Sequence, residues 1–300
     1  MSDFGLPIVF AVLVWWLGTG IVLLLDNLPR PTYRLSLALS TLLTLAALAG
    51  IGYSASDPSI GGAYVAFTCS ILAWGWHELT FLTGSLTGPR TQACSRPDDG
   101  FVRFAQAVQV IAWHEAAILA MAGLITALTW DAPNKVATWT FLLLWVLRLS
   151  AKLNLFFGVR NLSEEFLPDH LRYLSSYFRR RRMNFLFPFS VTFATVAVAL
   201  MVQQAIDASD PAFRVALMLP ASLLALGVVE HWMLMLPLPT TALWRWAMRA
   251  PVAGTVAIDD APSSSVKAPS PARRAAGSLT DTLALTPVPV ARDNPTSTSP

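Results

Sequence analysis

Charged residues are scarce in this 300-residue chain. Asp, Glu, Lys and Arg make up only 13% of it, against about 25% in soluble proteins. Hydrophobic residues make up 54%, and the mean hydropathy is +0.53. This balance excludes an ordinary soluble domain and predicts an integral membrane protein. The net charge is only +3, and the loop arginines that raise the pI do not indicate binding to nucleic acid, so we expect no nucleic-acid partner.

Cysteine is also scarce. The chain has two cysteines, of which Cys69 lies in an apolar run and Cys94 in a polar loop, so they are not expected to meet and a disulfide framework is excluded. No basic segment precedes the first apolar run, and we therefore expect no cleavable signal. The sequence contains no nucleotide-binding loop, no nucleophile–base arrangement and no recognisable transporter repeat.

What the chain has in abundance is long apolar runs. A membrane-spanning helix needs roughly 20 mostly apolar residues, and seven runs qualify. They are Leu6–Leu25, Tyr33–Tyr53, Gly61–Thr83, Arg103–Thr129, Val136–Phe157, Phe185–Ile206 and Ala212–Leu236. The expected fold is therefore an all-α, polytopic bundle of about seven transmembrane helices in one domain, residues 1–249. Residues 250–300 are rich in Ala, Pro, Ser and Thr, which predicts a disordered tail.

The loops alternate in arginine content. Loops one, three and five and the residues after the last helix are rich in arginine, whereas the opposite side carries only Lys135 and Arg214. Basic loops stay in the cytoplasm. We therefore expect a periplasmic N-terminus and a cytoplasmic C-terminus in a bacterial inner, or intracytoplasmic, membrane.

The fifth loop contains a second kind of pattern. From Leu162 to Met183, leucines and Phe178 recur at helical spacing, and four arginines follow at Arg179 to Arg182. This predicts an amphipathic helix on the cytoplasmic face that anchors on anionic headgroups. The stretch Leu167–Phe178 is also a candidate docking surface for a partner.

Histidine is rare, with four in the chain. Three of them lie beside a glutamate inside spanning runs, and the fourth, His170, follows Glu164 and Glu165 in the fifth loop. The three pairs are His77-Glu78, His114-Glu115 and Glu230-His231. An ionisable residue at membrane depth is costly and marks a functional-site candidate.

These groups are predicted to share one slab of the membrane. The helix rise of about 1.5 Å per residue places them, with Arg148 and Lys152 of the fifth run, roughly 8–16 Å from the cytoplasmic end. Five charges left unpaired there would cost on the order of 12–18 kcal/mol. They are therefore expected to face one another inside the bundle.

Three interpretations of this slab remain open. It is a neutralising network that fixes helix packing, a metal site, or a place that handles pigment. Imidazole and carboxylate suit iron, manganese or zinc, but the Glu-x-x-His spacing of di-iron bundles is missing. Neutral imidazole is also an axial ligand for a chlorophyll-type ring, on which tryptophans are able to stack. The flanking tryptophans are Trp15, Trp16, Trp74, Trp76, Trp113, Trp145 and Trp232.

Several long motifs carry a family resemblance. They are GAYVAF (Gly62 to Phe67), WGWHELTFLTG (Trp74 to Gly84), TGPR (Thr87 to Arg90), the block Thr140 to Phe178, MNFLFPFSVT (Met183 to Thr192) and EHWMLMLPLP (Glu230 to Pro239). Over about residues 1–249 the chain resembles the PuhE-type photosynthetic complex assembly proteins of purple phototrophic bacteria. The resemblance implies a gene near the reaction-centre H subunit and a link to reaction-centre assembly and bacteriochlorophyll production. The resemblance does not identify any catalytic residue in this chain.

The leading hypothesis is an assembly factor for the reaction centre–light-harvesting complex, linked to bacteriochlorophyll supply. Its partners would be the bilayer, reaction-centre or light-harvesting subunits and bacteriochlorophyll enzymes. His77, His114 and His231 are the candidate ligands of a bacteriochlorophyll or a precursor, and Arg148 and Lys152 pair with glutamates or with an acidic group of a tetrapyrrole.

The alternative hypothesis is a membrane oxidoreductase that acts on a tetrapyrrole intermediate with two iron or manganese ions. Its catalytic residues would be Glu115, Arg148 and Lys152. Its predicted metal ligands are His77, Glu78, His114, Glu115, Glu164, His170, Glu230 and His231, with Glu165 nearby.

Overall fold

The protein is an all-helical membrane bundle. The computed structural model describes residues 2–236 and 240–248, and the predicted tail, residues 250–300, lies outside them. Within this range the chain forms seven α-helices of 22 residues or more. Their bounds are α1 Ser2–Asp26, α2 Tyr33–Ala55, α3 Ile60–Leu82, α4 Gly100–Leu128, α5 Val136–Phe157, α6 Leu186–Asp207 and α7 Pro211–Met235. Each agrees within a few residues with a predicted run.

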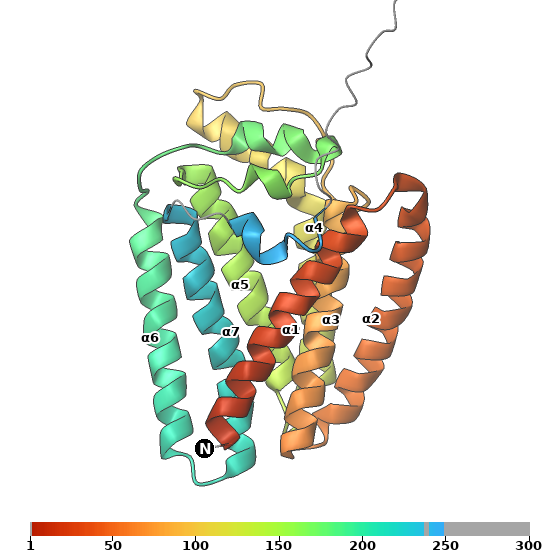
Figure 1. Cartoon of the computed structure of the whole chain (residues 1–300), viewed down its shortest axis with the longest axis vertical. Helices are drawn as coiled ribbons and strands as arrows, with labels where there is room; N and C mark the ends of the chain where they lie inside the picture. The colour runs from red at the N-terminus through yellow and green to blue at the C-terminus, as the bar shows by residue number, and fades with distance from the viewer. Residues whose placement is uncertain (1, 237–239, 249–300) are drawn as a thin grey trace, which may run out of the picture. The chain divides into compact units, whose positions relative to one another are not determined.

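The helices run alternately up and down, so α1, α3, α5 and α7 are parallel (Figure 1). Side-chain caps set several of their starts. Ser59 accepts from the N–H of Gly62, Asp99 from Phe101 and Val102, and Asp210 from Ala212 and Phe213. Each cap satisfies N–H groups that have no partner within the helix.

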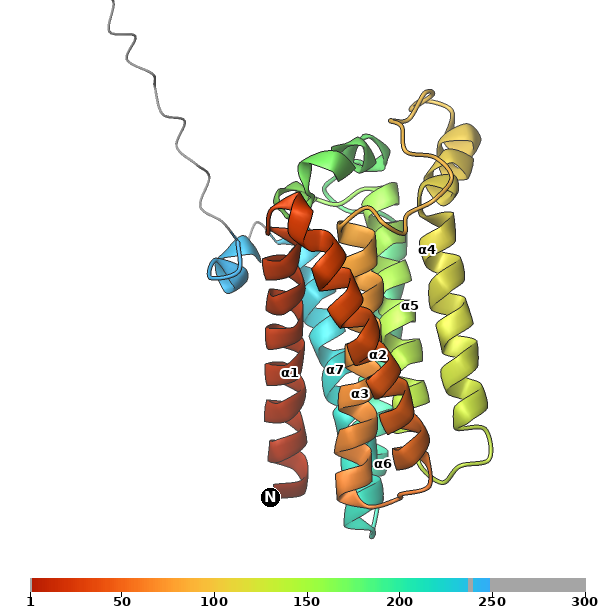
Figure 2. The same ribbon diagram turned by 90° about the vertical axis from the view of Figure 1, so that its right-hand side faces the viewer.

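α3 is the central helix. Twelve of its 23 residues are buried, and it packs against α1, α2, α5 and α7. Six helices of the described chain are long and apolar enough to cross a membrane, and α3 is not among them. The expectation of seven apolar spans therefore holds for six. α3 nevertheless passes from one end of the bundle to the other (Figure 2). Its polar side chains lower its hydropathy, but they face neighbouring helices rather than the outer surface of the bundle.

The outer helices face outward with apolar side chains. α6 buries only Phe187 and Ala205, and exposes Phe189, Phe193 and Leu200. Such a surface suits the hydrocarbon core of a bilayer. The apolar core lies between α1, α3, α4, α5 and α7, around Phe67, Phe141 and Leu219.

The arginine-rich end of the bundle is covered by loops and short helices. We give this name to the end formed by residues 27–32, 83–99, 158–185 and 240–248. The segment predicted as one amphipathic α-helix is instead two 3₁₀ helices, η2 Glu164–Phe166 and η3 Asp169–Tyr177. The three-residue period turns Leu171, Leu174 and Tyr177 to one side, where they are buried against Phe81, Val110 and Trp244. The apolar face predicted for a partner is therefore occupied by the chain itself.

Two buried polar residues attach this end to the helices. Arg103 of α4 donates to the carbonyl oxygens of Tyr177 (3.2 Å) and Phe156 (3.1 Å) and lies 3.8 Å from the ring centroid of Phe156. Asn184 donates to Asn154 and Gly158 and accepts from the N–H groups of Leu186 and Phe187. Asn184 thus caps α6 and holds the end of α5 with one side chain.

Candidate functional site: a charged layer inside the bundle

The charged residues predicted for one slab meet as ion pairs between helices. Arg148 of α5 binds Glu78 of α3 at 2.7 Å. One turn along α5, Lys152 binds Glu115 of α4 at 2.6 Å, and the Trp145 indole N–H donates to the other oxygen of Glu115 at 3.2 Å. The i, i+4 spacing of the two cations places both on one face of α5. The prediction that these charges face one another is therefore confirmed for two pairs.

The third glutamate has a different partner. Glu230 of α7 accepts from the Trp15 indole N–H of α1 at 2.9 Å, and it lies close enough to Arg148 for electrostatic attraction. Three carboxylates thus face two cations, which leaves one negative charge more than the cations neutralise when all five are ionised. The Trp15 donor stabilises that carboxylate as a charge-assisted hydrogen bond does.

The histidines separate into two environments. His231 is 3% exposed, and both its ring nitrogens have partners: Nδ1 lies 2.8 Å from the Gly227 carbonyl oxygen and Nε2 lies 2.8 Å from Ser150 Oγ. Because a carbonyl only accepts, Nδ1 carries the proton that His231 donates to Gly227. Ser150 also donates to Ser190 Oγ at 2.9 Å, so Nε2 belongs to a chain of hydrogen bonds between α5, α6 and α7. A metal or pigment would have to break the bond to Ser150, so His231 is poorly placed for the predicted ligand role.

Among the described residues, His77 and His114 are the histidines whose buried ring nitrogens have no hydrogen-bond partner. Each is 1% exposed, and their ring centroids lie 6.5 Å apart. Both nitrogens of His77, Nδ1 of His114 and Oε1 of Glu78 are buried without a hydrogen-bond partner. Phe141 lies 5.8 Å from His77 and Phe81 4.6 Å from His114, between ring centroids. A macrocycle cannot reach these nitrogens while α3, α4 and α5 keep this packing.

The predicted metal ligands do not assemble into one site. His170 lies at the arginine-rich end, where its Nε2 is 2.8 Å from the Leu82 carbonyl oxygen, and Glu164 faces Arg180 at 4.0 Å. In the described part of the chain, no group of three or more His, Cys, Asp or Glu side chains is arranged to hold a metal ion. The reason is that adjacent His and Glu point about 100° apart on a helix, and the glutamates turn toward Arg148, Lys152 and Trp15.

The loop between α3 and α4 supplies a contact that sequence reasoning missed. The backbone N–H of His114 donates to the Thr87 carbonyl oxygen at 2.8 Å, whereas in a regular helix it donates to the residue four earlier. Gly88 lies so close to α4 that a Cβ there would overlap the backbone of Gln109 and Val110. The first turns of α4 run obliquely across the end of the bundle, and the rest descends with the other helices (Figure 1). The glycine of the TGPR motif was the one feature of the sequence that could have indicated this contact, because glycine permits close approach of two backbones.

Comparison with known proteins places the chain in a family. The family described as "Protein of unknown function (DUF3623)" matches residues 1–254. The chain belongs to this family. It is also 35% identical over 277 residues to an "Uncharacterized 30.4 kDa protein in puhA 5'region" of Rhodobacter capsulatus, which covers 91% of this chain and 98% of that protein. No solved structure matches the chain.

Proposed function

We propose that this protein is a membrane assembly factor for the bacterial photosynthetic reaction centre–light-harvesting complex, linked to the supply of bacteriochlorophyll. The observation that carries the proposal is the relative from the puhA 5′ region, which aligns with 91% of this chain. Alignment over nearly the whole of both proteins supports a shared fold and a shared role rather than one shared motif. The resemblance in the TGPR and WGWHELTFLTG motifs supports the same conclusion.

Arg148 is the residue that we assign to contact with the assembling complex. Its side chain is 48% exposed although it lies in the middle of a spanning helix, and within the described part of the chain its hydrogen bond goes to Glu78. A guanidinium has five N–H donors, and an exposed cation near mid-bilayer costs about 2.5–3.5 kcal/mol. A carbonyl or carboxylate from a subunit helix or from a tetrapyrrole side chain would lower that cost. The partly buried pair of Lys152 and Glu115 would hold α4 and α5 in place around this contact.

The second candidate function is the metal-dependent oxidoreductase. The observation in its favour is the unused set of His77 ring nitrogens and Glu78 Oε1, since buried polar atoms normally have a partner. The two functions differ in what their loss does to pigment synthesis. An enzyme of bacteriochlorophyll synthesis leaves its substrate behind when it is deleted, whereas an assembly factor does not.

The test is deletion of the gene in its phototrophic host. We expect less reaction centre–light-harvesting complex by membrane absorption, with no accumulated precursor in extracted pigments. Complementation with Arg148→Gln should leave complex yield low while the protein itself is present on immunoblots. The matched control is Arg34→Gln, which removes an exposed arginine from the first turn of α2 and should restore the yield. An identifiable tetrapyrrole precursor in the deletion strain would favour the enzyme and contradict the assembly role.

A further inference from the structure

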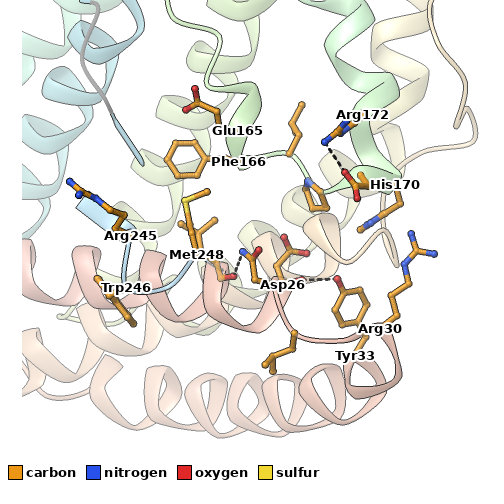
Figure 3. A pocket seen from close by; sticks show the side chains of 16 residues that line it. Asp26, Arg30, Tyr33, Glu165, Phe166, His170, Arg172, Arg245, Trp246 and Met248 are labelled. Carbon is orange, nitrogen blue, oxygen red and sulfur yellow. Dashed lines mark hydrogen bonds and ion pairs between the residues drawn. The ribbon is translucent and has the colours of Figure 1, made fainter. Parts of the chain in front are cut away.

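A large cavity lies at the arginine-rich end, away from the charged layer. Its volume is about 1030 Å³, and three parts of the chain line it: the turn between α1 and α2, the η2–η3 segment, and residues 245–248. Figure 3 shows Asp26 near the middle of the lining, with Met248 and Trp246 on one side and Tyr33, Arg30 and His170 on the other. The cavity is large enough for a ligand of drug size or more.

Asp26 is the most unusual residue in this cavity. It is 6% exposed, and its Oδ1 is buried without a hydrogen-bond partner. The Tyr33 hydroxyl donates to the main-chain oxygen of Asp26, at 2.6 Å, and not to its carboxylate. Asp26 is also the last residue of α1, where the negative end of the helix dipole disfavours a carboxylate. A buried anion in this position requires a cation or a hydrogen-bond donor.

The cavity also offers positive charge. Arg172 is bound to Asp169 at 2.9 Å, but among the described residues no hydrogen bond or ion pair engages the guanidinium groups of Arg30 and Arg245. Glu165 is also in the lining, so the cavity holds charges of both signs rather than a purely basic surface. A zwitterionic ligand matches this lining, because its cation would pair with Asp26 and its anion with an arginine.

The remaining lining is apolar and continues toward the membrane. Leu23, Phe166 and Trp246 line the cavity, and directly along α1 the side chains of Leu17, Ile21 and Leu24 are 45%, 50% and 41% exposed. These side chains belong to a spanning helix, so they offer acyl chains a surface that begins at the cavity. This continuity favours a lipid over a small soluble zwitterion.

We propose that the cavity binds a phospholipid whose headgroup carries both a phosphate and a primary ammonium, as in phosphatidylethanolamine. The ammonium donates to Asp26, the phosphate accepts from Arg30, and the acyl chains lie along the exposed face of α1. The inference rests on Asp26, Arg30, the cavity and the α1 surface, and it does not depend on the proposed function.

The test is lipid retention by the full-length protein in mild detergent, measured by native mass spectrometry. The probes are phosphatidylethanolamine, phosphatidylcholine and phosphatidylglycerol with identical acyl chains. Phosphatidylcholine has a quaternary ammonium that cannot donate, and phosphatidylglycerol has no cation. We expect phosphatidylethanolamine to bind about tenfold more tightly than either, as a hydrogen bond to a charged group implies.

Variants separate the two contacts. Asp26→Asn should abolish the preference for phosphatidylethanolamine, Asp26→Glu should keep it, and Arg30→Gln should weaken all three lipids. Asp98→Asn, at an exposed carboxylate of the same end, is the matched control and should bind like the unchanged protein. Equal retention of the three lipids, an unchanged preference in Asp26→Asn, or equally tight binding of free phosphoethanolamine would overturn the proposal. If Asp26→Asn fails to fold, the Asp26→Glu and Arg30→Gln results decide.

Discussion

The backbone N–H of His114 donates to the Thr87 carbonyl oxygen at 2.8 Å, in the middle of α4. This bond connects the loop between α3 and α4 directly to the charged layer, because Glu115 follows His114 and binds Lys152. The position of the Lys152–Glu115 pair therefore depends on how closely the loop approaches α4. Gly88 is the residue that permits the approach.

Gly88→Ala should destabilise the protein, because the new Cβ would overlap the α4 backbone, which cannot move aside as a flexible side chain does. We expect a loss of about 1–3 kcal/mol or more, seen as a lower midpoint of thermal unfolding in detergent. Gly123→Ala is the control in the same helix, since nothing lies within 4 Å of its added Cβ. Equal midpoints for the two variants would show that Gly88 is not needed for packing.

Lys152→Met should leave Glu115 as an unpaired carboxylate inside the bundle. The side chains of Lys152 and Glu115 are 20% and 18% exposed. Breaking a fully buried pair costs about 3–5 kcal/mol, so breaking this partly buried pair should cost less than that. The double variant with Glu115→Gln should recover most of the loss, because no unpaired charge remains. Unfolding midpoints of the two single variants and the double variant form the measurement. A double variant no more stable than Lys152→Met would argue against a neutralising pair.

Trp15→Phe should remove the indole donor to Glu230 while keeping an aromatic ring. A hydrogen bond to a charged group contributes about 1.5–3 kcal/mol, so the thermal midpoint should fall, and Glu230→Gln in the same chain should reduce the effect. Trp139→Phe serves as the control, because Trp139 is 57% exposed and should tolerate the change. Similar midpoints for Trp15→Phe and Trp139→Phe would mean that the bond to Glu230 contributes little.

Asn184→Ala should weaken the junction between α5 and α6. The substitution removes the cap of α6 and leaves the Asn154 and Gly158 oxygens without their donor, at a cost of about 2–4 kcal/mol. Gln204→Ala, at an exposed residue of α6, should change stability by no more than about 0.5 kcal/mol. Limited proteolysis at Arg179 to Arg182 reports the junction directly, and unchanged cleavage in Asn184→Ala would contradict the assigned role.

The sequence by itself determined the membrane class, the seven helices and the residues of the charged layer. Each of these can be read along the chain without knowledge of contacts: the class and the helices from the length of the apolar runs and the turn residues between them, and the charged layer from the few charged residues inside those runs. The cost of isolated charges in a bilayer was also enough to predict that Glu78 and Glu115 would find Arg148 and Lys152. The orientation in the membrane and residues 250–300 remain predictions from the sequence.

Only the tertiary structure decided which polar side chains are hydrogen-bonded to one another and which are left without a partner. Adjacent His and Glu leave a helix in different directions, so whether His77 stays unused while His231 binds Ser150 depends on how α3, α5 and α7 pack. The fifth loop was predicted as an α-helix from its leucine spacing, but packing against Phe81 and Trp244 selected a 3₁₀ helix. The roles of Asp26 and Thr87 could not be predicted from the sequence for the same reason. The cavity around Asp26 and the bond from His114 to Thr87 form only when segments distant in the sequence meet.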